Sequence, residues 1–164
     1  MKMDTQQIEI IGKHILIANL LAANLEVAEP IRDHGIDLIV FRDGSDGNKF
    51  IACPIQLKTA TNEAFELHEK YKKFPCLRIV FVWKAKVPAD AEFFCLTYKE
   101  AEGILKTEDH AETDSWKNGK HWVTTKPSGT LKEKLEKYRV KSPDDWPGIL
   151  GMAESTIIFS KAEA

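Results

Sequence analysis

The sequence has few cysteines, and their spacing suits neither a disulfide framework nor a zinc site. Its 164 residues contain three cysteines, an odd number, which are widely separated and lie in apolar sequence: Cys53, Cys76 and Cys95. Small disulfide-rich secreted proteins carry an even number of cysteines, and zinc sites carry cysteines in close pairs. We therefore expect free thiols and a reducing compartment, which predicts a cytoplasmic protein.

The sequence also lacks a long apolar run. The only candidate, Ile15 to Ala23, is interrupted by Asn19 and is shorter than the roughly 20 residues that span a bilayer. It fits a buried helix better, so we expect no membrane partner. No repeat or low-complexity tract appears. A length of 164 residues with 43% hydrophobic composition suits one domain, residues 1–164.

A basic excess over the whole chain is missing too, because the formal net charge is −2. Local charge is uneven. Residues 67–86 hold six Lys and Arg against one Glu, and residues 117–141 hold eight against two, whereas residues 88–115 hold eight acidic residues against two lysines. Basic runs of this kind are either solvated faces or a stripe that binds phosphate. The candidates for contact with DNA are Lys70, Lys72, Lys73, Lys132, Lys134 and Arg139.

Two short apolar segments, Ile36–Phe41 and Phe50–Lys58, predict a β-hairpin. Both are rich in β-branched or aromatic residues, and two Asp-Gly turn signals lie between them. A pairing centred near residue 46 or 47 sets Asp37 opposite the stretch from Gln56 to Lys58. Directly opposed side chains project to the same side of a sheet, so a carboxylate, an amide and an amine are expected to converge.

These three polar residues interrupt runs that are otherwise apolar, and an unpaired buried charge costs several kcal/mol. A functional site explains the pattern, and so does a structural ion pair between Asp37 and Lys58. Pro54 removes a donor from the hydrogen-bond ladder, which predicts a bulge or a locally unpaired stretch just before Gln56.

The residues resemble those of the PD-(D/E)xK nuclease superfamily, whose core is a helix followed by a hairpin with an Asp on one strand and an acid-x-Lys on the next. Gly35-Ile36-Asp37 is similar to the first strand element. Gln56-Leu57-Lys58, followed by Thr59-Ala60, is similar to the variant in which Gln replaces the acid. The resemblance covers about residues 6–60 and, more loosely, 78–83. It departs at the helix, where the superfamily often has a Glu and this chain offers Lys13 or His14.

The resemblance implies an α/β fold with a mixed sheet flanked by helices, in a restriction-endonuclease-like αβββαβ order. It also implies hydrolysis of DNA by a metal-dependent endonuclease. Mg²⁺ would be held by Asp37, Gln56 and the Leu57 carbonyl, and Lys58 would position the attacking water. A second carboxylate would come from Glu9, Glu26, Glu29 or Asp33.

The helix leaves two alternatives open. If His14 faces the site, Mn²⁺ is favoured over Mg²⁺; if Lys13 does, its charge repels a metal. The second case favours a nuclease-fold module that binds nucleic acid or assembles a complex without cleaving, and a third alternative is a purely structural partner. His34, just before Asp37, is a peripheral candidate that usually faces solvent. A monomer and a homodimer both stay open.

Local patterns predict the other elements. We expect a helix at 6–24, a short strand at 25–28, a helix at 63–72, strands at 78–83 and 92–97, and an edge strand at 156–159. Capping boxes at Thr97–Glu100 and Thr130–Glu133 predict two further helices, the first ending near 106. Trp116 and Trp122 are expected in core or interface packing rather than in stacking on a base.

Overall fold

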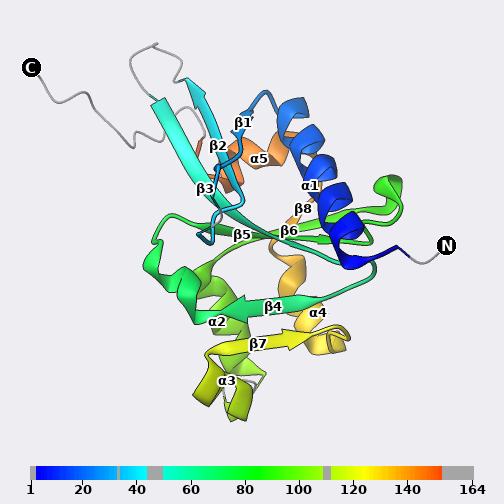
Figure 1. Cartoon of the computed structure of the whole chain (residues 1–164), viewed down its shortest axis with the longest axis vertical. Coiled ribbons are helices and arrows are strands. Elements are labelled where there is room, and N and C mark those ends of the chain that lie inside the picture. Colours follow the sequence, from blue (N-terminus) through cyan, green and yellow to red (C-terminus); the bar gives the residue numbers. More distant parts are fainter. Residues whose placement is uncertain (1–2, 33, 44–49, 109–111, 153–164) are drawn as a thin grey trace, which may run out of the picture.

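The computed structural model describes residues 3–32, 34–43, 50–108 and 112–152. Figure 1 shows the elements, which run in the order α1 (Thr5–Ala22), β1 (Glu26–Ala28), β2 (Leu38–Asp43), β3 (Phe50–Thr59), β4 (Phe65–His68), η1 (Glu69–Lys73), β5 (Arg78–Trp83), η2 (Pro88–Asp90), β6 (Glu92–Thr97), α2 (Tyr98–Thr107), α3 (Asp114–Gly119), β7 (His121–Thr124), α4 (Gly129–Glu136), β8 (Arg139–Val140), η4 (Pro143–Asp145) and α5 (Trp146–Ile149). The η elements are short 3₁₀ helices.

A mixed six-stranded sheet in the order β1-β2-β3-β5-β6-β8 forms the centre of the fold. The β3–β5 pair is parallel and the others are antiparallel, while β4 and β7 form a separate two-stranded sheet. The expected α/β fold with a mixed, helix-flanked sheet is confirmed. The chain that connects β3 to β5 contains β4 and η1, where the αβββαβ order calls for a helix.

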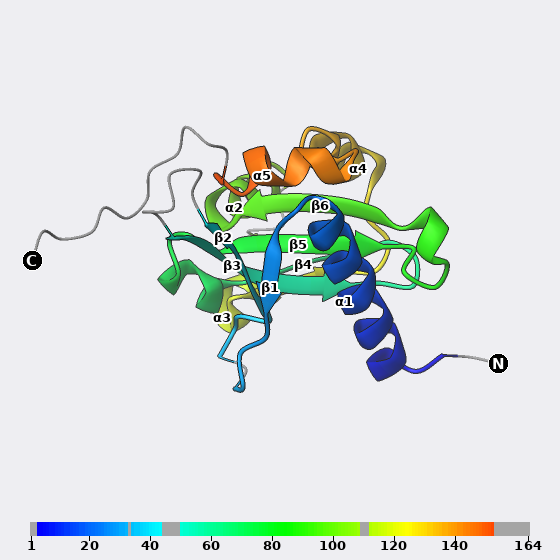
Figure 2. The ribbon, with the colours of Figure 1, turned by 90° about the horizontal axis from the view of Figure 1, so that it is seen from above.

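Both faces of the central sheet are covered. Helices α1 and α5 lie on one face, and α2, α4 and the β4–β7 sheet lie on the other (Figures 1 and 2). Each face has its own apolar cluster, the first containing Leu16 and Trp146 and the second containing Phe65. Trp116 and Trp122 belong to the second cluster with 7% and 8% of their surface exposed, so their expected role in packing is confirmed.

Helix α1 lies against β3 because glycine occupies the point of closest approach. A Cβ at Gly12 would lie 2.2 Å from Cγ2 of Thr59, well inside contact distance. The helix starts after Asp4, whose side chain accepts from the N–H of Gln7, and Asn24 follows its end with a left-handed φ of 57°. The helix expected at 6–24 is therefore confirmed to within two residues at each end. No helix in the described part of the chain combines the length and the apolar character that a membrane crossing requires.

Strands β2 and β3 pair in the expected register, with Leu38 opposite Ile55 and Asp43 opposite Phe50. The bulge expected at Pro54 is wrong, because the pairing with β2 runs through it without a break. The other alternative, a locally unpaired stretch, is confirmed only on the β5 side, where the pairing begins at Ile55. Successive residues of a strand point their backbone N–H and C=O groups to opposite sides. The carbonyl of Ile55 points toward β2, where it accepts from Asp37, so the nitrogen of Pro54 points toward β5. Strand β5 begins opposite Ile55, so the nitrogen of Pro54 faces no described strand and the missing donor costs nothing.

The helix expected at 63–72 is wrong. Phe65 and Leu67 are buried and alternate with half-buried Glu66 and His68, and this period of two forms strand β4. Only the basic end of the segment is helical, and it forms the short 3₁₀ helix η1.

Of the two expected capping boxes, the one at Thr97–Glu100 is confirmed and the one at Thr130–Glu133 is wrong. Ser128 caps α4 instead, because its Oγ accepts from the N–H of Leu131 at 3.0 Å. The expected edge strand at 156–159 lies outside the described residues.

Candidate functional site

Strand β3 continues past the start of β2 and leaves an open edge. Strand β2 begins at Leu38, opposite Ile55, so the described residues of β2 offer no partner to 56–59. Asp37 takes the place of the missing strand. Its N–H donates to the Ile55 carbonyl at 2.8 Å, and its Oδ2 accepts from the N–H of Leu57 at 2.6 Å. The carboxylate thus extends the ladder and is held at the open edge.

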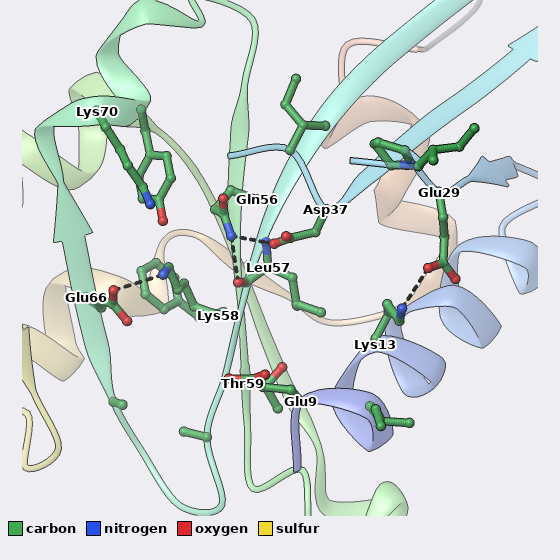
Figure 3. Close-up of a pocket in the computed structure, with 18 residues that line it drawn as sticks. Glu9, Lys13, Glu29, Asp37, Gln56, Leu57, Lys58, Thr59, Glu66 and Lys70 are labelled. Atoms are coloured by element: carbon green, nitrogen blue, oxygen red, sulfur yellow. Dashed lines mark hydrogen bonds and ion pairs between the residues drawn. The ribbon is translucent and has the colours of Figure 1, made fainter. Parts of the chain in front are cut away.

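A cavity of about 590 Å³ lies at this edge, between α1, the end of β3, and β4 with η1 (Figure 3). Asp37, Gln56, Leu57 and Lys58 all line it. The structure therefore brings together the side chains that the hairpin register predicted to converge.

Gln56 is the one buried residue with a polar or charged side chain of this kind in the described part of the chain, with 6% of its surface exposed. Its Nε2 donates to Oδ2 of Asp37 and, at 3.2 Å, to the carbonyl of Leu57. One amide group therefore touches both of the other oxygen donors that the nuclease resemblance assigns to a metal ion (Figure 3).

These donors fit Mg²⁺ in kind. A half turn of the Gln56 amide exchanges Nε2 for Oε1 and leaves a carboxylate, an amide oxygen and a carbonyl oxygen together, all ligands that a hard cation takes. Within the described residues no three His, Cys, Asp or Glu side chains form a metal-binding group. A bound ion would therefore rely on one certain carboxylate, Asp37, with two neutral oxygens.

Lys58 forms its ion pair with Glu66 of β4. The Nζ to Oε1 distance is 2.9 Å, and Nε2 of His121 lies 3.1 Å from the same oxygen. Burial acts to lower the pKa of Lys58, but its bonds to Glu66 and Tyr71 outweigh burial and hold the pKa above its ordinary value. Burial acts to raise the pKa of Glu66, and its contacts with Lys58 and His121 hold the pKa below the ordinary value. The sequence left open a structural ion pair between Asp37 and Lys58. Among the described residues, the ion pair of Lys58 is with Glu66 instead.

The cavity wall from α1 carries Glu9 and Lys13, which lie one turn apart on the same face. Nζ of Lys13 pairs with Oε2 of Glu29 at 2.7 Å. Of the carboxylates considered for a second ligand, Glu9 and Glu29 line the cavity, Glu26 does not, and Asp33 lies outside the described residues.

Neither of the two peripheral histidines lines the cavity. Nδ1 of His14 lies 2.8 Å from the carbonyl of Ile10, and His14 lines a separate apolar groove formed by α1 and Pro88. His34 is exposed. The helix rotation that would have favoured Mn²⁺ is therefore wrong, because Lys13 rather than His14 lines the cavity, beside Glu9.

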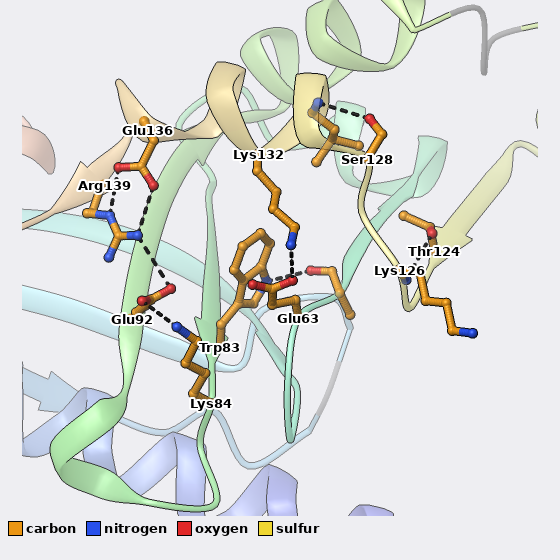
Figure 4. Close-up of polar contacts among 12 residues, drawn as sticks. Glu63, Trp83, Lys84, Glu92, Thr124, Lys126, Ser128, Lys132, Glu136 and Arg139 are labelled. Atoms are coloured by element: carbon orange, nitrogen blue, oxygen red, sulfur yellow. Dashed lines mark hydrogen bonds and ion pairs between the residues drawn. The ribbon is translucent and has the colours of Figure 1, made fainter.

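The basic residues expected to contact DNA fall into two groups. Lys70 lines the cavity, Lys72 and Lys73 are exposed beside it on η1, and no ion pair ties any of the three to a described acidic residue. The other three are each bound to a carboxylate: Lys132 to Glu63 at 2.5 Å, Lys134 to Glu108 at 2.5 Å, and Arg139 to Glu136 at 2.8 Å. Figure 4 shows the first and third of these pairs.

Reasoning from the sequence missed Glu66 and His121 as parts of the site. The signal was present in the alternation of apolar and polar residues from Phe65 to His68, which has the period of a strand. A strand there puts Glu66 on the opposite face from Phe65 and Leu67, which are buried in the core.

Comparisons of this chain with protein-family models, with curated proteins and with solved structures found no match. An assignment of function therefore depends on the chemistry and geometry of the cavity.

Proposed function

We propose that this cavity hydrolyses phosphodiester bonds in DNA with the help of Mg²⁺. The observation that carries the proposal is the contact of the Gln56 amide with both the Asp37 carboxylate and the Leu57 carbonyl, in a cavity that Lys58 also lines. Oxygen donors for a hard cation beside an ammonium group suit a phosphate ester, whose reaction builds negative charge.

The residues divide the work between the ion and the substrate. Asp37, Gln56 and the Leu57 carbonyl would hold Mg²⁺, which supplies charge stabilisation and lowers the pKa of a bound water. Lys58 donates to a phosphate oxygen, and Lys70 at the rim binds a neighbouring phosphate. In the reaction, the water oxygen bonds to phosphorus while the bond to the leaving oxygen breaks. The leaving oxygen keeps the electron pair and takes a proton, and the attacking water releases one to solvent.

The substitution Gln56→Glu tests the metal site, because it keeps the shape of the side chain and adds a carboxylate beside Asp37. Without metal the two carboxylates repel each other, so Mg²⁺ should bind more tightly and raise the melting temperature more than in the wild type. Calorimetric titration with MgCl₂ and cleavage of labelled single- and double-stranded DNA would measure this. Absence of both Mg²⁺ binding and cleavage in the wild type and in Gln56→Glu would contradict the proposal.

A second function is favoured by one observation, the ammonium of Lys13 in the cavity wall. A cation there opposes Mg²⁺ binding, and it suits a module that binds nucleic acid and does not cleave it. The charge reversal Lys13→Glu separates the two functions. If the cavity is a nuclease site, the reversal strengthens Mg²⁺ binding and raises the cleavage rate. If the protein is a binding module, it gains neither and loses DNA affinity.

Lys117→Glu is the matched control, because Lys117 is also paired with a surface carboxylate, Glu112, at 2.6 Å and lies outside the cavity. This control should leave Mg²⁺ binding unchanged.

A further inference from the structure

Strand β4 carries a carboxylate to Lys58 from a different sheet. Glu66 lies on β4, which pairs with β7 rather than with the central sheet, and its Oε1 contacts Nζ of Lys58 at 2.9 Å. The same oxygen lies 3.1 Å from Nε2 of His121, which belongs to β7. One carboxylate oxygen thus joins Lys58 to the β4–β7 sheet.

The ammonium of Lys58 is enclosed as well as paired. Its side chain is 19% exposed, and Nζ lies 5.4 Å from the centroid of the Tyr71 ring on η1. A lysine side chain has four rotatable bonds, so a free ammonium would sample many positions in the cavity. The carboxylate of Glu66 and the face of Tyr71 together restrict Nζ to one region.

We propose that Glu66 is a positioning residue for Lys58: it holds Nζ at one place in the cavity, where Lys58 donates to a phosphate oxygen and stabilises the negative charge that develops there. This inference rests on the proposed phosphodiester hydrolysis. In that reaction the proton of the attacking water goes to solvent, and the leaving oxygen takes its proton from solvent.

The chain offers a close control in Glu92. This carboxylate also binds a lysine eight residues earlier, Lys84 at 2.7 Å, and also contacts a second basic residue, Arg139 at 3.4 Å (Figure 4). Neither Glu92 nor Lys84 lines the cavity. Glu66→Gln and Glu92→Gln therefore remove equivalent charges from equivalent networks, and only the first acts at the cavity.

The experiment measures single-turnover cleavage of a labelled DNA with Mg²⁺ at one fixed pH. In Glu66→Gln we expect a rate about 10- to 100-fold lower than in the wild type, the usual loss for a group that orients a functional residue. We expect an unchanged DNA dissociation constant, which a general disturbance of the cavity would not leave unchanged. Glu66→Asp keeps the charge and should recover part of the rate, and Glu92→Gln should match the wild type.

A second measurement needs no catalysis. The mobility of the Lys58 side chain is read from the relaxation of the ¹³Cε signal of labelled lysine, assigned by its loss in Lys58→Met, and it should be greater in Glu66→Gln than in the wild type or in Glu92→Gln. If Glu66→Gln does not fold, Glu66→Asp is measured in its place and should also show greater mobility than the wild type, because a carboxylate one methylene shorter holds Nζ less closely.

Three results separate the inference from the function on which it rests. A wild-type rate in Glu66→Gln overturns the positioning role while leaving the nuclease proposal in place. A Lys58 side chain as rigid in that variant as in the wild type also overturns the positioning role. Absence of cleavage by the wild type overturns the proposed function, and the lysine signal still decides whether Glu66 holds the ammonium.

Discussion

Glu66 and Glu92 have nearly the same partners and very different surroundings. Each holds a lysine eight residues earlier and one further basic residue. The side chain of Lys58 is 19% exposed and that of Lys84 is 43% exposed, whereas the carboxylates differ in the opposite sense, with Glu66 31% and Glu92 21% exposed. What separates the two pairs is position: Lys58 and Glu66 line the cavity, and Lys84 and Glu92 do not.

The same contrast extends to the whole of each region. We define the cavity side as Asp37, Gln56, Lys58, Glu66 and Lys70, and the α4 side as Glu63, Lys84, Glu92, Lys132 and Arg139. On the α4 side the two lysines and Arg139 are bound to carboxylates, whereas on the cavity side Lys70 has no ion pair with a described acidic residue. A basic stretch of sequence becomes a surface that binds anions only where the fold leaves its charges unpaired.

The largest difference between the two sides should appear in cleavage. We expect Asp37→Asn and Lys58→Ala to lower the cleavage rate about 100-fold or more, because each removes a group that faces the phosphate or its metal. Asp37→Asn keeps an oxygen for the donors of Gln56 and Leu57, so its melting temperature should stay close to that of the wild type. Lys84→Ala on the α4 side is the control and should cleave normally. Equal cleavage rates in all three variants would show that the cavity side is no more important for cleavage than the α4 side.

The next largest effect concerns the wall of the cavity. We expect Gly12→Ala to lower the free energy of unfolding by about 1–3 kcal/mol, because the new methyl group overlaps Thr59, whose short branched side chain cannot move aside. Gly103, at an exposed position in α2, has no atom within 4 Å of an added Cβ. Gly103→Ala should therefore stabilise the protein by up to about 1 kcal/mol. Urea unfolding of both variants would measure the change in the free energy of unfolding. A change of the same sign in both variants would show that the close contact between Gly12 and Thr59 does not hold α1 in place.

DNA binding gives a smaller contrast. We expect the pair of substitutions Lys72→Gln and Lys73→Gln to weaken DNA binding and to reduce the dependence of log Kd on log salt by about 1 per lysine. Lys132→Gln with Lys134→Gln removes the same charge from residues already bound to carboxylates, and should change the salt dependence little. Fluorescence anisotropy at several NaCl concentrations would compare the two double variants. A larger loss of DNA affinity in the Lys132→Gln, Lys134→Gln double variant would show that DNA binds on the α4 side instead.

The contribution to stability in acid should be similar for Glu66 and Glu92, unlike the effects described above. The pKa values of Glu66 and Glu92 both lie below the ordinary 4.5, so the stability they contribute is present above about pH 4.5 and is lost as pH falls through the folded values. Between about pH 5 and pH 3, the melting temperature of Glu66→Gln and of Glu92→Gln should fall less steeply than that of the wild type. Calorimetric melting curves over this range would test it, and a wild-type slope in either variant would contradict the pairing of that carboxylate.

Local patterns were enough to predict the hairpin, its register and the convergence of Asp37 with Gln56 and Lys58. Alternation and a short turn determine which residues oppose each other over 20 residues, and no other part of the chain is needed. The capping box of α2 and the extent of α1 follow from equally local signals. The error at β4 came from the basic end of the segment, which suits a helix, while the alternation from Phe65 to His68 was overlooked.

Contacts between distant segments decided the rest. His121 reaches Glu66 across 55 residues of chain, and no local pattern connects them. The rotation of α1, which turns Lys13 rather than His14 to the cavity, depends on the fit of Gly12 against Thr59. The acid partners of Lys132 and Lys134 come from other segments of the chain, so the sequence determines that these charges exist and the tertiary structure determines that they are neutralised.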